Sequence, residues 1–143
     1  MKKILCFNLL FFGVLFNSVL SHAAELAYVT NEKDDNISVI DLRQNKVIKT
    51  ITVGQRPRGI IFNNDHTLAY ICASESDSIQ ILDLQTEQII GELPSGEDPE
   101  TIALHPNGKI IYTSNEDDAV LTIIDIATSV VIAQIDVGVE REG

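Results

Sequence analysis

Short apolar segments separated by polar turns recur along the chain with a constant spacing of 42 residues. A tyrosine, an aspartate and a glycine mark the three copies most clearly. They are Tyr28, Tyr70 and Tyr112; Asp41, Asp83 and Asp125; and Gly54, Gly96 and Gly138. Between them the apolar residues change identity but keep their size and polarity, as expected of buried positions that can be filled interchangeably. The chain is therefore a tandem repeat.

Each copy predicts four strands. In the second copy the apolar segments cover residues 60–62, 68–73, 79–84 and 88–93, and polar turns separate them. Segments of this length, rich in Ile, Val and Tyr and bounded by Gly, Pro, Asn and Asp, are typical of strands. Beyond residue 23 no helical period is evident. The third segment is apolar on both faces, which suits an inner strand, and the fourth is mixed, which suits an outer strand with one face in water.

Four strands in about 40 to 45 residues are the signature of a β-propeller blade. The sequence therefore predicts an all-β fold, with four-stranded antiparallel blades over residues 24–143 in units of about 26–58, 59–100 and 101–143. A solenoid of stacked β units is the alternative, although solenoid coils usually repeat at shorter periods. The first unit has no counterpart of the first strand.

About three blades are fewer than the four to eight that close a propeller ring. The chain also ends where a further first strand would begin, because residues 137–143 match residues 53–59. We expect from this count that the sequence is the amino-terminal part of a longer propeller, truncated at its C-terminus. The rival is a short protein whose ring closes by oligomerisation.

Residues 1–23 have the pattern of a secretory signal. Lys2 and Lys3 precede an apolar stretch, and small residues near Ala23 offer a cleavage site. An uncleaved membrane anchor is the alternative, but the apolar stretch is short for a spanning helix. We expect a periplasmic or secreted product that keeps no membrane segment after cleavage. Its remaining cysteine, Cys72, lies within a predicted strand and is interpreted as a small buried residue rather than a reactive thiol.

The net charge is −11, with 21 acidic against 10 basic residues. Removal of Lys2 and Lys3 would make it two charges more negative. Such an acidic chain is unsuited to nucleic acid and to anionic membrane surfaces. A solvated acidic surface is the simplest interpretation, and electrostatic steering of a cationic partner is the alternative.

The motif at residues 28–31, Tyr-Val-Thr-Asn, with the turn Val53-Gly54-x-x-Pro57-x-Gly59, resembles the YVTN family of β-propeller repeats. The resemblance covers residues 24–143. It weakens to Tyr-Ile-Cys-Ala at residues 70–73 and to Tyr-Thr-Ser-Asn at 112–115, and Arg141 stands where Pro57 and Pro99 predict proline.

Four segments resemble more closely the β-propeller proteins associated with PQQ-dependent catabolism. They are residues 31–36, 54–59, 94–100 and 114–118. The resemblance implies an exported protein, longer than this chain, that is encoded beside quinoprotein alcohol dehydrogenases and their c-type cytochromes. A periplasmic quinoprotein dehydrogenase or c-type cytochrome is thus the implied partner. The molecular role of the group is undefined.

Motifs for chemistry are absent from the sequence. It has no Trp, on which quinoprotein propellers usually stack their cofactor, and no Cys-x-x-Cys-His for haem. No nucleophile elbow, zinc motif or phosphate loop occurs. His66 and His105 fall in predicted turns. Asp41, Asp83 and Asp125 end the third strand of each unit, where a carboxylate can accept hydrogen bonds from amides two residues on. We therefore expect no catalytic residue, no bound cofactor and no metal.

Acidic loops between the second and third strands share one face with the connections between units, because strand direction alternates. Loops on a rigid scaffold are where binding concentrates. The candidate binding residues of this face are Asp34, Asp35, Asn36, Arg56, Arg58, Asp98, Glu100, Asp117 and Asp118. Residues 34–36 and 116–118 offer the oxygen ligands that calcium prefers, but the spacing fits no EF-hand, so solvated loops are the preferred interpretation.

These observations favour an exported, non-catalytic scaffold or binding module, accessory to periplasmic PQQ-dependent alcohol oxidation. Two alternatives stay open. One is an enzyme or cofactor-binding propeller whose site lies in blades beyond this sequence. The other is a cell-surface or adhesion propeller.

Overall fold

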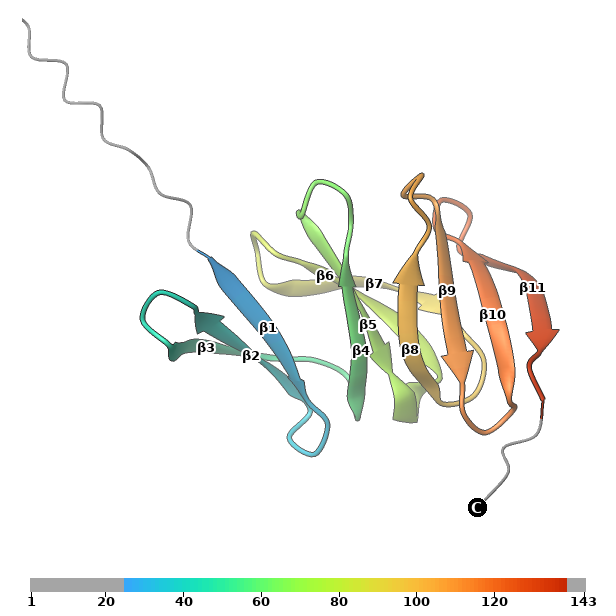
Figure 1. Cartoon of the computed structure of the whole chain (residues 1–143), viewed down its shortest axis with the longest axis horizontal. Coiled ribbons are helices and arrows are strands. Elements are labelled where there is room, and N and C mark those ends of the chain that lie inside the picture. Colours follow the sequence, from blue (N-terminus) through green and yellow to red (C-terminus); the bar gives the residue numbers. More distant parts are fainter. Residues whose placement is uncertain (1–24, 139–143) are drawn as a thin grey trace, which may run out of the picture.

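The computed structural model describes residues 25–138, which form three antiparallel sheets of consecutive strands (Figure 1). The first sheet contains β1 (Leu26–Asn31), β2 (Asn36–Asp41) and β3 (Lys46–Thr52). The second contains β4 (Pro57–Phe62), β5 (Leu68–Ala73), β6 (Ser78–Asp83) and β7 (Gln88–Pro94). The third contains β8 (Pro99–Leu104), β9 (Ile110–Asn115), β10 (Val120–Asp125) and β11 (Val130–Asp136). This arrangement confirms the predicted all-β fold of propeller blades in an open row.

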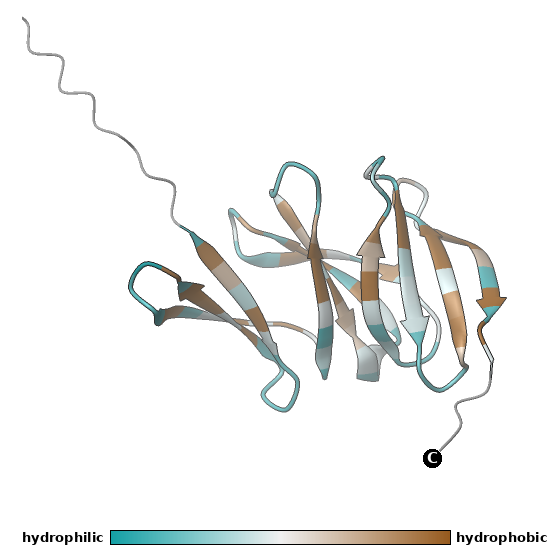
Figure 2. Ribbon diagram, viewed as in Figure 1, coloured by the Kyte–Doolittle hydropathy of each residue, from teal (hydrophilic) through white to brown (hydrophobic). Residues whose placement is uncertain are grey.

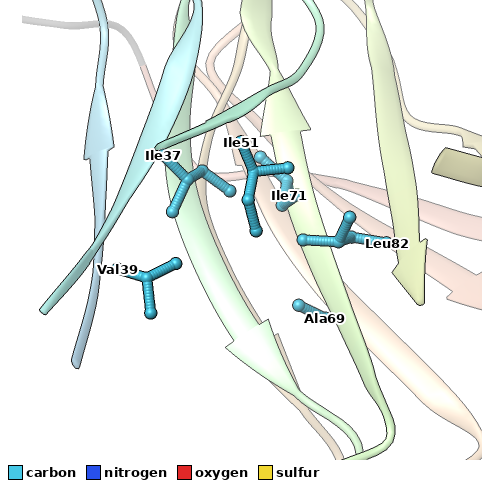
Figure 3. Close-up of a cluster of buried hydrophobic side chains, with 6 residues drawn as sticks. All are labelled: Ile37, Val39, Ile51, Ala69, Ile71 and Leu82. Carbon is cyan, nitrogen blue, oxygen red and sulfur yellow. The ribbon is translucent and has the colours of Figure 1, made fainter. Parts of the chain in front are cut away.

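Apolar side chains lie between the sheets, because the repeat places them at the same positions in each copy. Between the first and second sheets, Ile37, Val39 and Ile51 pack against side chains from β5 and β6 (Figure 3). A second cluster joins the second and third sheets and includes Tyr70, Cys72, Ile79, Leu93, Ile111 and Ile124. Figure 2 shows the apolar residues recurring along the strands while the turns are hydrophilic. The middle sheet is therefore covered on both faces.

The strand order agrees with the predicted positions of inner and outer strands. In the second sheet β6 lies between β5 and β7 and most of its side chains are buried, whereas β3, the last strand of its sheet, is exposed except at Ile51. Within residues 25–138 the first sheet has three strands, and none of these residues pairs with β1 at the position that β4 and β8 occupy in the other sheets. β4 and β8 are the first strands of the second and third sheets, and they contact each other.

Two local features differ from the sequence prediction. The first strand of the second unit was expected to begin at Ile60, but β4 begins at Pro57, which pairs with Ala73. A register shift between Pro57 and Ile60 carries the strand through this stretch, and a proline at a strand start leaves no ladder bond unmade. The second is a short 3₁₀ helix, Ser74–Ser76, which forms within the polar turn predicted between residues 73 and 79.

Within residues 25–138, no helix has the length and apolar character needed to cross a bilayer. The predicted signal at 1–23, the candidate cleavage site and the residues beyond Gly138, Arg141 among them, lie outside the described part of the chain.

Candidate functional site

The β1–β2, β5–β6 and β9–β10 turns meet the connections between sheets along one edge of the molecule. We call this edge the loop face and define it as residues 32–36, 53–58, 74–77, 95–100 and 116–119. Asp35 Oδ1 accepts a hydrogen bond from the Arg56 amide at 3.0 Å, and Asp77 Oδ1 accepts one from the Asp98 amide at the same distance. Each of these bonds joins a turn of one sheet to the connection that leads into the next.

Arg58 lies at the centre of the loop face. It projects from β4 of the second sheet, and its guanidinium reaches carboxylates of the first and third sheets. Nη1 is 2.7 Å from Glu116 Oε2 and 2.9 Å from Glu100 Oε1, while Nε is 3.4 Å from Glu32 Oε1. The hydrogen bond to Glu116 and the nearby carboxylates raise the pKa of Arg58 against the opposing effect of its partial burial. The side chain is thus a permanent cation that links the β1–β2 turn, the start of β8 and the β9–β10 turn.

Arg56 forms a second, more open centre beside Arg58. Its Nε lies 3.4 Å from Glu32 Oε1, and its Nη1 lies 3.5 Å from Glu75 Oε2 and 3.9 Å from Asp98 Oδ1. Partial desolvation lowers the pKa of Arg56, but Asp98 and the other carboxylates outweigh this and raise it. Asp98 is buried, and its Oδ1 accepts no hydrogen bond from the described residues. Arg56 therefore supplies the charge that faces this carboxylate.

The structure brings some of the predicted candidates together and leaves others apart. Arg56, Arg58, Asp98 and Glu100 form one ion-pair network, and Asp35 holds the main chain at Arg56. The remaining candidates form hydrogen bonds within their own turns or are exposed to solvent. Asn36 Nδ2 donates to the Asp34 carbonyl at 2.9 Å, and Asp117 and Asp118 are exposed in the β9–β10 turn.

Three carboxylates of the network begin the predicted acidic loops but were not among the candidate binding residues. They are Glu32, Glu75 and Glu116. The 42-residue repeat could have pointed to two of these three carboxylates. Glu32 and Glu116 occupy the same position in the first and third units, where the second unit has Ser74. Both reach Arg58, which lies between them.

Comparison with known proteins agrees with this architecture. A model of the YNCE-like beta-propeller family matches residues 62–143, more than half of the chain. The chain belongs to this family. No curated protein is similar enough in sequence to count as a match.

Solved structures resemble this YNCE-like β-propeller chain in fold. Hydrazine synthase from Kuenenia stuttgartiensis gives a TM-score of 0.71 at 22% identity, over 87% of this chain and 39% of that one. The dihydro-heme d1 dehydrogenase NirN, solved with DHE, gives 0.62 at 18% identity, over 80% and 25%. A functionally unknown protein from Desulfotomaculum acetoxidans gives 0.63 at 17%, over 76% and 38%. The chain thus spans well under half of each relative, and at these identities the likeness shows the fold alone.

The loop face of the YNCE-like chain carries a shallow pocket of about 440 Å³, lined by Glu32, Lys33, Asp35, Gln55, Arg56 and Glu75. These side chains present charges of both signs and the amide group of Gln55 to the pocket. Residues 25–138 contain no group of three or more His, Cys, Asp or Glu side chains placed to hold a metal ion. The arrangement is suited to binding charged groups of a partner.

Other residues weighed from the sequence have structural roles in this propeller. Cys72 is buried between the second and third sheets, and burial raises the pKa of its thiol to about 11, which confirms the structural interpretation. His66 and His105 lie next to or within turns, as predicted, and His105 Nδ1 accepts a hydrogen bond from the Asn107 amide. The three strand-end aspartates accept amide hydrogen bonds from residues two or three positions on, which confirms their predicted role.

Proposed function

We propose that this chain is an exported, non-catalytic propeller module that binds a partner protein through its loop face. The observation that supports this proposal is the network centred on Arg58, which links β4 of the second sheet to the β1–β2 turn of the first sheet and to β8 and the β9–β10 turn of the third. Binding loops need such support, because a surface held in one geometry loses little conformational entropy when a partner docks.

The surface held in this way is acidic. Two guanidinium groups face five carboxylates, and further acids such as Asp34, Asp117 and Asp118 lie exposed around them. Together with a net charge of −11, this distribution attracts a partner that presents a basic surface. Complementary charge of this kind acts mainly on the rate of association and makes it sensitive to salt.

The partner we propose is a periplasmic quinoprotein dehydrogenase or its c-type cytochrome, so that the module is accessory to PQQ-dependent alcohol oxidation. This proposal rests on the resemblance of residues 31–36, 54–59, 94–100 and 114–118 to propellers associated with that catabolism, and on the predicted signal at residues 1–23.

The test is recovery of the tagged full-length chain from its own organism under low salt, with identification of the bound proteins. The decisive comparison is between two double variants that change net charge equally. Asp117→Asn with Asp118→Asn removes two negative charges from the loop face, whereas Gln85→Lys with Gln88→Lys adds two positive charges at or beside the β6–β7 turn of the opposite edge. We expect the first pair to slow association several-fold more than the second. Equal effects, or recovery of neither a dehydrogenase nor a cytochrome, would contradict the proposal.

A second candidate is a propeller that forms part of an enzyme assembly. It is favoured by the names of two similar structures, a hydrazine synthase and a dihydro-heme d1 dehydrogenase. The absorption spectrum of the purified native protein separates the candidates. A haem or quinone band that remains after high-salt washing would support the enzyme, and its absence would support the binding module.

A further inference from the structure

Arg56 holds its carboxylate partners more loosely than Arg58 holds Glu116. The Arg58 Nη1 atom is 2.7 Å from Glu116 Oε2. The Arg56 Nε and Nη2 atoms both lie 3.4 Å from Glu32 Oε1, and its Nη1 lies 3.5 Å from Glu75 Oε2. Hydrogen bonds between a guanidinium and a carboxylate are usually about 2.7 to 2.9 Å long. Arg56 is therefore close to both carboxylates without being tightly bound to either.

A buried carboxylate that lacks a hydrogen-bond donor lies next to Arg56. Asp98 is 9% exposed, and its Oδ1 accepts no hydrogen bond from the described residues. Arg56 Nη1 lies 3.9 Å from this oxygen, which is within ion-pair range but too far for a hydrogen bond. A buried carboxylate oxygen in this position costs free energy, because it has lost contact with water and has gained no donor in return. A short movement of the Arg56 guanidinium towards Asp98 would supply the donor.

The connection between the first and second sheets does not depend on where the Arg56 side chain lies. Its main chain is held by Asp35 Oδ1, which accepts from the Arg56 amide at 3.0 Å, and by the Ser74 amide, which donates to the Arg56 carbonyl at 3.2 Å. The next connection has the same amide bond, between Asp77 Oδ1 and the Asp98 amide, with an aspartate in place of the arginine. The Arg56 side chain, which is 38% exposed, can thus rotate while its backbone stays fixed.

The guanidinium of Arg56 also lines the pocket of about 440 Å³ on the loop face. This volume falls within the range of about 300 to 1,000 Å³ that is usual for ligand sites. The lining contains three carboxylates against two cations, and Glu32 and Glu75 are the two carboxylates that Arg56 contacts. Because one planar guanidinium reaches both of them, a second guanidinium that enters from solvent matches the same pair, whereas a compact ammonium group cannot span it as a fork does.

We propose that this pocket binds one arginine side chain of the partner protein, whose guanidinium contacts Glu32 and Glu75 while Arg56 moves onto Asp98. The inference rests on the proposed function for its partner and names the side chain that the loop face recognises. Entry of the ligand and movement of Arg56 favour each other, because each guanidinium then has its own carboxylates. The buried Oδ1 of Asp98 gains a donor in the same step.

The experiment is a titration of the full-length chain at low salt with the peptide acetyl-Gly-Arg-Gly-amide, compared with the same peptide carrying lysine or glutamine in place of arginine. Three variants each remove one negative charge. Glu75→Gln changes the pocket, Asp98→Asn changes the acceptor for Arg56, and Glu97→Gln is the matched control. Glu97 precedes Asp98 in the same connection, but it is exposed and does not line the pocket.

We expect the arginine peptide to bind the unchanged chain more tightly than the lysine peptide, and the glutamine peptide not to bind. Glu75→Gln and Asp98→Asn should each weaken arginine binding by about fivefold or more, since each removes a charge-assisted hydrogen bond of the bound state. Glu97→Gln should weaken it by less than about twofold, as expected of an exposed charge outside the site. The NMR signal of the Arg56 Nε–H group should shift on addition of the arginine peptide and should stay in place in Asp98→Asn.

Equal binding of the three peptides, equal losses in Asp98→Asn and Glu97→Gln, or an Arg56 signal that does not respond in the unchanged chain would overturn the inference. The proposed function is judged separately, by recovery of the partner. A recovered dehydrogenase or cytochrome together with a pocket that ignores the arginine peptide would refute the arginine site alone. A pocket that binds the peptide as expected, with no such partner recovered, would support the site and refute the proposed function alone.

Discussion

Arg58 and Glu100 occupy the same position in consecutive repeats and form an ion pair with a distance of 2.9 Å between Nη1 and Oε1. In a perfect repeat, identical side chains would face one another at this point, and like charges would repel. The same exchange of sign occurs at the neighbouring position, where Arg56 faces Asp98. The connection into the second sheet has thus diverged in charge from the connection into the third, while the strand geometry is kept.

Reversal of the charge at position 58 should therefore be costly. Arg58→Glu places a carboxylate among three others, and we expect a loss of unfolding free energy that exceeds that of Arg58→Met. The coupling between positions 58 and 100 should be about 0.2 to 1 kcal/mol, the usual range for exposed pairs. Chemical denaturation of the single variants and of the swap Arg58→Glu with Glu100→Arg measures it. A swap no more stable than the sum of its single changes would show that the pair contributes nothing.

Gly59 permits close approach of the second and third sheets. A Cβ on it would lie 2.8 Å from the Glu100 carbonyl oxygen and 3.2 Å from Cys72 Sγ. Because that oxygen belongs to the backbone of β8, we expect Gly59→Ala to cost about 1 to 3 kcal/mol. Gly91→Ala is the control, since its Cβ would meet only Ile81 Cδ1 at 3.7 Å. Thermal unfolding compares the two, and similar melting temperatures would refute the explanation.

Cys72 should be unreactive in the folded protein. Burial raises the pKa of its thiol to about 11, so little thiolate is present at pH 8, and the side chain is inaccessible. We expect an alkylating reagent to label Cys72 quickly in denaturant and slowly without it. Peptide mass mapping gives the two rates, and comparable rates would mean that the second and third sheets separate readily.

The strand-end aspartates should contribute to the acid stability of the fold. The Thr86 amide holds the pKa of Asp83 below its ordinary value of 3.8, and the Gln44 and Thr128 amides act likewise on the pKa values of Asp41 and Asp125. A lowered folded pKa stabilises the fold at higher pH, and this stability is lost as the pH falls below about 3.8 through the folded value.

Replacement of all three aspartates by asparagine keeps an acceptor oxygen but removes the titration. The unfolding free energy of this variant should depend less on pH below pH 4 than that of the unchanged chain, by the linkage relation. Denaturation curves at several acidic pH values check this. Parallel pH profiles for the two proteins would assign the acid sensitivity to other groups.

The constant register made the fold predictable. Once Tyr28, Tyr70 and Tyr112 are aligned, the strands, the shared edge of their loops and the missing first strand follow from strand alternation alone. The start of β4 was not predictable, because the register shift after Pro57 depends on its pairing with Ala73.

The sequence predicted which face of the molecule carries the candidate site, but not the contacts within that site. The sequence placed Arg58 and Glu100 on it, but the contact between Arg58 and Glu116 depends on how far consecutive sheets rotate about each other. That rotation is set by packing between sheets and leaves no local pattern. Ala119 shows another limit. It adopts the same left-handed backbone conformation as Asp35 and Asp77, its equivalents in the other two repeats. Those aspartates accept a hydrogen bond from the connection to the next sheet, and an alanine has no carboxylate to do so. No sequence rule predicts that alanine occurs at this position.

Burial of the middle sheet on both faces has a consequence for how the chain opens. Among residues 25–138 the buried apolar clusters join consecutive sheets, so stability is close to a sum of nearest-neighbour contacts, and either outer sheet can detach while the other two persist. β5, which is almost wholly buried, should exchange its amide hydrogens most slowly, and the exposed strands β3 and β11 should exchange most quickly. The molecule would then unzip from its ends toward β4–β7, and those strands would be the last to lose protection.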